Sequence, residues 1–119
     1  MTNINLPRDY KDYLARESPT HGFTDLEFVG YFILWLLDEI DDLNRQYKLN
    51  NYAPGFLAFG SDGGGELLVF DMNGAIFAMP AIGMSSDVAI EIAESWSYFY
   101  SHIAVDSAGN WMLDAPVYP

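Results

Sequence analysis

The segment from Gly55 to Asp71, GFLAFGSDGGGELLVFD, constrains the possible folds more than any other part of the chain. Two apolar runs, Phe56–Phe59 and Leu67–Phe70, flank a serine, an aspartate and three consecutive glycines. Val and Phe suit a pleated, half-buried surface, and glycine adopts the positive φ angles that a tight turn requires. The segment therefore predicts two strands joined by a glycine turn.

A second reversal follows, because Asp71-Met72-Asn73-Gly74 leads directly into another apolar run, Ala75–Pro80. An Asn-Gly pair between two apolar runs is a strong short-range signal for a hairpin. The middle of the sequence thus predicts a three-stranded antiparallel meander, and the remaining elements are expected to pack on it.

Three other segments show the apolar spacing of amphipathic helices. The first has Asn5 as a candidate N-cap and Pro7 in its first turn. The second covers 37–48 and the third covers 85–103, with candidate N-caps at 85–87. The residues of the three apolar faces are Leu6, Tyr10, Tyr13 and Leu14; Leu36, Ile40, Leu43 and Tyr47; and Ala89, Ile92, Ala93, Trp96, Phe99, Tyr100 and Ile103.

The run Phe28–Trp35 is rich in aromatic and β-branched residues and predicts a further strand, preceded by a loop over Gly22–Glu27. The tail contains a WML run, 111–113, that allows one short edge strand before the prolines that follow. The expected fold is α+β, a mainly antiparallel sheet with a central meander and about three flanking helices. Residues 1–119 are expected to form a single domain.

The charge of the chain restricts its partners. Five Lys and Arg against 17 Asp and Glu give a formal net charge of -12. Such a field repels a phosphate backbone, so no direct nucleic-acid binding is expected, whereas it attracts a basic protein. The same charge would also serve solubility alone.

The chain contains no cysteine, so neither disulfides nor thiolate metal sites contribute to the fold. Its first residues lack the basic and apolar regions of a secretory signal. Its longest apolar run, around Phe32–Leu37, is shorter than the ~20 residues that a membrane span needs. A soluble, cytoplasmic protein without membrane association is expected.

Four motifs occur in a telling order: the opening LPRDYKDYL, the aromatic and acidic YFILWLLDEI, the glycine segment FGSDGGGELLVFD and the closing IAESWSYFY. Together they resemble the Smi-Knr family of the SUKH superfamily, from about Leu6 to Tyr100. The resemblance implies an α+β domain without catalytic residues. It also implies a bacterial immunity protein that neutralises a polymorphic or contact-dependent toxin, often a nuclease, while fungal members are linked to cell-wall assembly.

The glycine loop carries no phosphate-binding signature, because a P-loop places Lys and a hydroxyl residue after its glycines and Gly65 precedes Glu66. Asp62, Glu66 and Asp71 could offer oxygen ligands to Ca²⁺ or Mg²⁺. Strand alternation, however, places Glu66 and Asp71 on opposite faces. No metal and no cofactor are therefore expected.

Nucleophilic catalysis also finds no candidate. Ser101 and His102 are neighbours on a predicted helix, where their side chains point about 100° apart. Trp35 and Trp96 lie on apolar stripes and are predicted to be core residues. Trp111, near the C-terminus, is predicted to be an exposed contact residue, because Trp is enriched at interface hot spots.

The sequence thus favours a non-enzymatic binding protein, whose carboxylates engage the lysines and arginines of a basic toxin domain. A regulatory interaction module in envelope assembly is the alternative, and an enzyme or small-molecule binder is a third possibility. A solvated helix face and a turn would explain the same acidic residues. The residues predicted to contact the partner are Asp38, Glu39, Asp41, Asp42, Asp62, Glu66 and Trp111.

Overall fold

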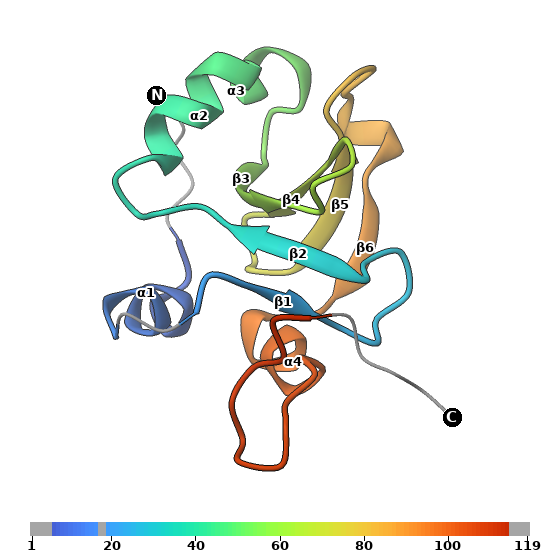
Figure 1. Cartoon of the computed structure of the whole chain (residues 1–119). Helices are drawn as coiled ribbons and strands as arrows, with labels where there is room; N and C mark the ends of the chain where they lie inside the picture. The colour runs from blue at the N-terminus through green and yellow to red at the C-terminus, as the bar shows by residue number, and fades with distance from the viewer. Residues whose placement is uncertain (1–5, 17–18, 115–119) are drawn as a thin grey trace.

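The computed structural model describes residues 6–16 and 19–114, and its six strands form one curled antiparallel sheet (Figure 1). The strand order is β1-β2-β3-β4-β5-β6, so each strand pairs with its neighbours in sequence. The strands are β1 (His21–Phe23), β2 (Tyr31–Leu34), β3 (Leu57–Ser61), β4 (Glu66–Phe70), β5 (Ile76–Pro80) and β6 (Ile90–Ala93).

Helices cover both faces of this sheet (Figure 1): α1 and α4 pack on one face, α3 packs on the other, and α2 contributes Ile40 to the cluster of α1 and α4. The expected α+β class is confirmed, and the described residues form four α-helices where about three were expected. The helices are α1 (Arg8–Ala15), α2 (Ile40–Tyr47), α3 (Leu49–Tyr52) and α4 (Trp96–Ser101), and a 3-10 turn, η1 (Ser86–Val88), precedes β6.

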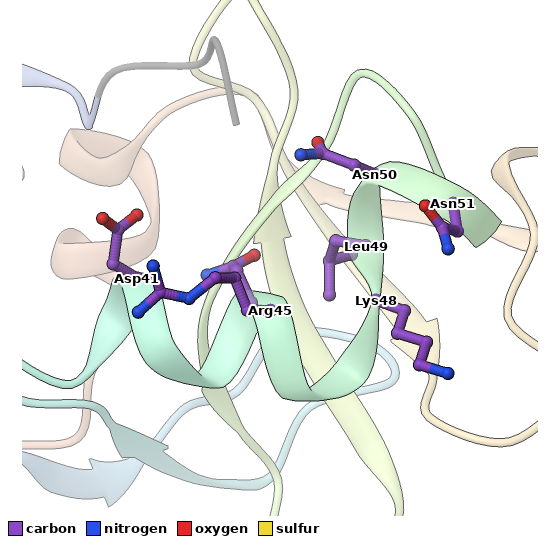
Figure 2. A pocket seen from close by; sticks show the side chains of 7 residues that line it. Asp41, Arg45, Lys48, Leu49, Asn50 and Asn51 are labelled. Atoms are coloured by element: carbon purple, nitrogen blue, oxygen red, sulfur yellow. The ribbon is translucent and has the colours of Figure 1, made fainter. Parts of the chain in front are cut away.

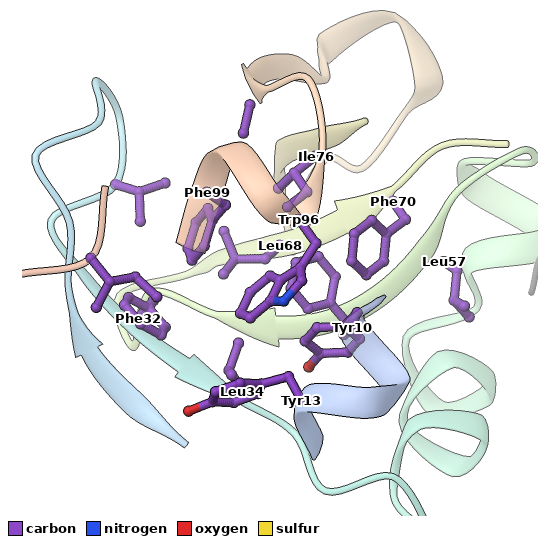
Figure 3. Packing of buried hydrophobic residues seen from close by; sticks show 14 of the residues in the cluster. Tyr10, Tyr13, Phe32, Leu34, Leu57, Leu68, Phe70, Ile76, Trp96 and Phe99 are labelled. Carbon is purple, nitrogen blue, oxygen red and sulfur yellow. The ribbon is translucent and has the colours of Figure 1, made fainter. Parts of the chain in front are cut away.

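The larger part of the core lies between the sheet and the pair α1 and α4 (Figure 3). Tyr10 of α1 is fully buried there, with its ring centroid 4.8 Å from that of Trp96, 5.0 Å from Phe59 and 5.3 Å from Phe70. All three contacts are edge-on, the arrangement that ring quadrupoles favour. The same burial raises the pKa of the Tyr10 hydroxyl far above its ordinary value.

The predicted meander is confirmed as β3, β4 and β5. Leu68 and Phe70 of β4 pack toward α1 and α4, whereas Leu67 and Val69 join a second cluster with Leu49 of α3. Successive side chains of a strand point to opposite faces, so a strand covered on both sides has no polar positions. This explains the uninterrupted apolar run of β4.

Within residues 6–16 and 19–114, three turns have the same hydrogen-bond pattern, in which an aspartate precedes a glycine by three positions. In each turn the aspartate Oδ1 accepts hydrogen bonds of 2.7 to 3.0 Å from the backbone N–H groups two and four residues later. The glycine in each has a φ between 84° and 110°, which only glycine adopts readily. The three pairs are Asp62 and Gly65, Asp71 and Gly74, and Asp106 and Gly109.

The predicted helix over 85–103 is wrong in its first half. The chain instead forms η1 and then β6, which pairs with β5, and α4 begins only at Trp96. Val88, Ile90 and Ile92 also alternate with period two, and β-branched residues suit a strand, so two periodicities coexist in this segment. Pairing with the edge of β5 decides between them, and the hydroxyl of Ser95 caps α4 through the Tyr98 N–H at 3.0 Å.

Smaller differences occur at the ends of the elements. The expected loop 22–27 begins inside β1, and β2 starts only at Tyr31 because Phe28 adopts a φ of 69° in the preceding turn. The second predicted helix, 37–48, begins only at Ile40 and ends at Tyr47, and Lys48, with a φ of 60°, separates it from the short α3 that the sequence did not predict. The tail forms an isolated bridge between Val105 and Trp111 rather than an edge strand. Asn5, the candidate N-cap, lies outside the described residues.

Gly60 marks a close approach of β2 to β3, because a Cβ atom there would lie 2.4 Å from the Ile33 carbonyl oxygen. Backbone atoms must move to accommodate such a contact. We therefore expect Gly60→Ala to lower the free energy of unfolding by about 2 kcal/mol, measured by chemical denaturation.

Gly64→Ala is the matched control, since a Cβ there meets its nearest neighbour, the Asp62 side chain, at 3.6 Å. The stability of this control should change by less than about 0.5 kcal/mol. Equal stability of the two variants would contradict the close approach seen at Gly60.

Candidate partner-binding surface

The N-terminal end of α2 presents four carboxylates, those of Asp38, Glu39, Asp41 and Asp42, which we call the acidic α2 surface. All four residues are exposed, while Ile40 of the same segment is buried in the core. Two of them lie in the first helical turn, where negative charge complements the helix dipole. The four predicted residues of this segment therefore form one continuous surface.

Two short-range contacts order this acidic segment. The Glu39 Oε1 accepts a hydrogen bond of 3.0 Å from the Leu36 N–H, which closes the turn that leads into α2. Arg45 forms an ion pair with Asp42. Asp38 and Asp41 take part in no ion pair among the described residues, so their carboxylates are available to a partner.

Asn44 fixes α2 to the sheet, although its polar side chain made it an unlikely core residue from sequence. It is only 5% exposed, and its Oδ1 accepts a hydrogen bond of 2.8 Å from the Ala58 N–H. Its Nδ2 donates to the carbonyl oxygens of Ala58 at 2.8 Å and Ile40 at 2.7 Å. The Asn44 amide thus takes both backbone hydrogen bonds that a neighbouring strand would otherwise form with Ala58.

The apolar stripe predicted for this helix is confirmed at Ile40 but is wrong at Leu36 and Tyr47. Ile40 and Asn44 are the buried residues of α2, whereas Leu36 is 53% exposed and Tyr47 is 39% exposed. Tyr47 instead stacks on Trp35, with ring centroids 6.1 Å apart and planes 7° apart. Asn44 turns its own face of α2 toward β3 by bonding to the Ala58 backbone. The spacing of apolar residues does not reveal this contact, because the buried residue is polar.

A cavity of about 220 Å³ opens in the bend between α2 and α3 (Figure 2). The cavity is smaller than the ~300 to 1,000 Å³ of typical small-molecule sites. Its lining combines carboxylate, amide and cationic groups: Asp41, Asn44, Arg45, Lys48, Leu49, Asn50 and Asn51.

Asp62 and Glu66 do not join the acidic α2 surface. Their turn lies beside Tyr31, since a Cβ atom at Gly63 would lie 3.6 Å from the Tyr31 ring. Tyr31 begins β2, whereas α2 follows the other end of that strand (Figure 1). The structure therefore separates the predicted acidic residues into two groups, and Asp62 also serves its own turn through its Oδ1.

Burial raises the pKa of the Glu66 carboxyl, and the negative charge of Asp62 raises it further. A carboxyl with a raised pKa binds its proton more tightly in the folded than in the unfolded state. The free energy of unfolding therefore decreases as the pH rises from the unfolded-state pKa through the folded-state pKa of Glu66. We expect Glu66→Gln to increase Tm at pH 7, because the variant removes a charge that the folded state disfavours. The increase should be only about 1 to 2 °C, because the site is largely solvated.

The increase should disappear at about pH 3, where the carboxyl is protonated in both states. Thermal unfolding across this pH range measures it, with Glu27→Gln at an exposed site as the matched control. A Glu66→Gln variant less stable than the original chain at pH 7 would contradict the raised pKa.

Trp111, predicted to be an exposed contact, is instead a core residue and only 8% exposed. It stacks on Tyr13 with ring centroids 4.9 Å apart and meets Phe32 edge-on at 5.5 Å. The tail turn that starts at Asp106 folds it back against the core. Trp96 is buried as predicted, and Trp35 is half-buried.

Ser101 and His102 form separate contacts, as their adjacent positions predicted. The Ser101 hydroxyl donates to the Tyr98 carbonyl oxygen at 2.7 Å, and the His102 Nδ1 lies 2.7 Å from an Asp25 carboxylate oxygen.

In the ranges 6–16 and 19–114, no group of three His, Asp or Glu side chains is placed to hold a metal ion. No helix in these ranges has the length and apolarity to cross a membrane.

Comparison with protein families connects this fold to a known group. The model of the SMI1 / KNR4 family (SUKH-1) matches residues 1–102. Comparison with curated proteins yields no match. The matched range includes the acidic α2 surface, the meander and α4, and it ends before Trp111.

Proposed function

Because the chain belongs to the SMI1 / KNR4 family (SUKH-1), we propose that it is a cytoplasmic immunity protein without catalytic activity of its own. In this proposal it binds a cognate toxin domain and covers the surface with which the toxin engages its substrate. The toxin is basic, as a nuclease is, because an enzyme that holds phosphates does so with lysine and arginine.

The observation that carries the proposal is the acidic α2 surface. Its four exposed carboxylates fall within five consecutive positions, and the whole chain has a net charge of -12. Asn44 and the Glu39 side chain hold this segment in place before any partner arrives. A preorganised set of carboxylates can pair with the cations of a nuclease without a large ordering cost.

Apolar side chains lie beside these charges and can anchor an interface. Leu36 and Leu37, which lead into α2, are 53% and 54% exposed, and Tyr47 is 39% exposed. Stable interfaces combine a few apolar or aromatic anchors with a charged periphery. The segment 36–47 supplies both kinds of residue.

The first test is a pull-down from the native host with the tagged chain as bait. Capture of the C-terminal domain of a large secreted protein, toxic alone and silenced by co-expression with this chain, would support the proposal. Capture of envelope-assembly proteins would contradict it and favour the regulatory role instead.

With the partner in hand, the double variant Asp38→Lys/Asp41→Lys should bind at least tenfold more weakly and protect cells poorly. This variant leaves Asp42 paired with Arg45 and the Glu39 hydrogen bond intact. The matched control, Asp12→Lys/Glu27→Lys, changes the net charge equally at exposed positions outside α2. Equal loss in both double variants would show that total charge, and not this surface, is responsible.

Acidic steering also predicts a salt effect on the rate of association. Between about 20 mM and physiological salt, the rate constant should fall roughly tenfold, because the Debye length contracts to about 8 Å. Stopped-flow or surface-based kinetics with the purified toxin domain measures this rate. A rate constant independent of salt would argue against electrostatic recognition.

A further inference from the structure

The strand β6 forms an open edge of the sheet. It pairs with β5 on one side, and no residue in the described ranges pairs with its other side. At the opposite end of the sheet, β1 is closed by the chain after α4, whose Ala104 N–H donates to the Phe23 carbonyl oxygen at 2.8 Å. An open edge presents backbone N–H and C=O groups that can pair with another chain.

A shallow groove of about 300 Å³ lies beside β6. It is lined by Glu91, Ile92 and Ala93 of β6, by Glu94, and by Tyr98 from the first turn of α4. Tyr98 is 40% exposed, so its ring is accessible from the groove. An extended peptide lying along β6 would therefore meet free backbone groups and an aromatic side chain together.

The side chains at this edge define the chemistry of the occupant. Glu91 and Glu94 are exposed, and neither forms an ion pair or a side-chain hydrogen bond among the described residues. Val88, at the end of η1, and Ile90, at the start of β6, are 44% and 43% exposed. The edge thus offers unneutralised acidic groups together with an apolar pair.

A second copy of this chain is a poor occupant. Pairing β6 with β6 would bring the Glu91 and Glu94 carboxylates of both copies to one seam, and each chain already has a net charge of -12. Like charges on paired strands are destabilising. The acidic groups therefore oppose self-association and select a chain of the opposite charge.

We propose that β6 accepts an added β-strand from a partner protein, an extended segment in which basic residues alternate with apolar ones. Backbone hydrogen bonds to β6 supply affinity, and lysine or arginine opposite Glu91 and an apolar residue opposite Ile90 supply selectivity. The strand β6 lies three strands away from β3, the strand that α2 contacts (Figure 1), and the inference does not depend on toxin neutralisation.

The test uses the full chain and a ten-residue peptide of alternating valine and lysine, followed by NMR. Peptide addition should shift the amide signals of β6 and Tyr98 and slow hydrogen exchange of the outward-facing β6 amides at least fivefold. The same peptide with alternate backbone nitrogens methylated, and a valine-glutamate peptide, should each bind at least tenfold more weakly. Both controls leave the protein unchanged.

Charge reversal on the protein completes the test. Glu91→Lys/Glu94→Lys should weaken binding of the valine-lysine peptide at least tenfold, whereas Asp38→Lys/Asp41→Lys should change it less than twofold. The second variant alters the acidic α2 surface, on which the proposed function depends, and leaves β6 unchanged. Loss of toxin binding in that variant and loss of peptide binding in the Glu91→Lys/Glu94→Lys variant therefore test the two proposals separately. No binding at millimolar peptide, undiminished binding of the methylated peptide, or equal loss in both variants would overturn the inference.

Discussion

Replacing Asn44 by alanine is expected to lower the free energy of unfolding by about 4 kcal/mol. The reason is that one buried amide satisfies both the N–H and the C=O of Ala58, whose own surface is fully buried. Removing the amide leaves two backbone groups without a partner in the interior, each at a cost of about 1 to 3 kcal/mol. Urea denaturation of the variant measures this loss.

The matched control is Asn51→Ala, an exposed asparagine on the neighbouring α3. Its stability should change by less than about 0.5 kcal/mol. Hydrogen exchange adds a local readout, because α2 should lose protection in the Asn44→Ala variant before the meander does. If both asparagine variants were equally stable, Asn44 would not be the link between α2 and β3.

Replacing Trp111 by alanine is expected to cost about 3 kcal/mol of stability. Its ring fills the space between Tyr13 and Phe32, so truncation leaves a cavity that the surrounding aromatic side chains can only partly close. Trp111 lies beyond the range matched by the family model, so this chain completes its core with a residue of its tail.

Thermal and chemical denaturation measure the Trp111→Ala effect, and Leu113→Ala, at a side chain 51% exposed, is the matched control. An exposed contact residue would show the reverse pattern, with unchanged stability and weakened partner binding. The measurement therefore separates the core position seen in the structure from the contact role expected from sequence.

Much of the fold could be predicted from short segments of sequence. The glycine turn after β3 and the Asn-Gly turn after β4 were predictable because an Asp-x-x-Gly segment closes its own hydrogen bonds. The same spacing recurs at Asp106 and could have predicted the tail turn as well. The order of the motifs also indicated the family that the comparison found.

The candidate site was predicted only in part. Asp38 and its acidic neighbours form one surface because they fall within five positions, in the turn before α2 and in its first helical turn, which is information that the sequence holds. Their separation from Asp62 and Glu66 was not predictable, because it depends on which end of β2 each segment follows. The open edge of β6 was not predictable either, because the apolar spacing of its segment also fits a helix and only pairing with β5 makes it a strand.

The α+β class, the meander and the acidic character of the segment 38–42 were predictable, because each depends on residues within a few positions of one another. The folded chain was needed to show that 90–93 form a strand, that Asn44 is a core residue and that Trp111 is buried. Each of these depends on a partner distant in sequence, namely β5, Ala58 and Tyr13. The free-energy difference between local helix and strand propensities is smaller than the free energy that these long-range contacts contribute. The contacts therefore decide the structure.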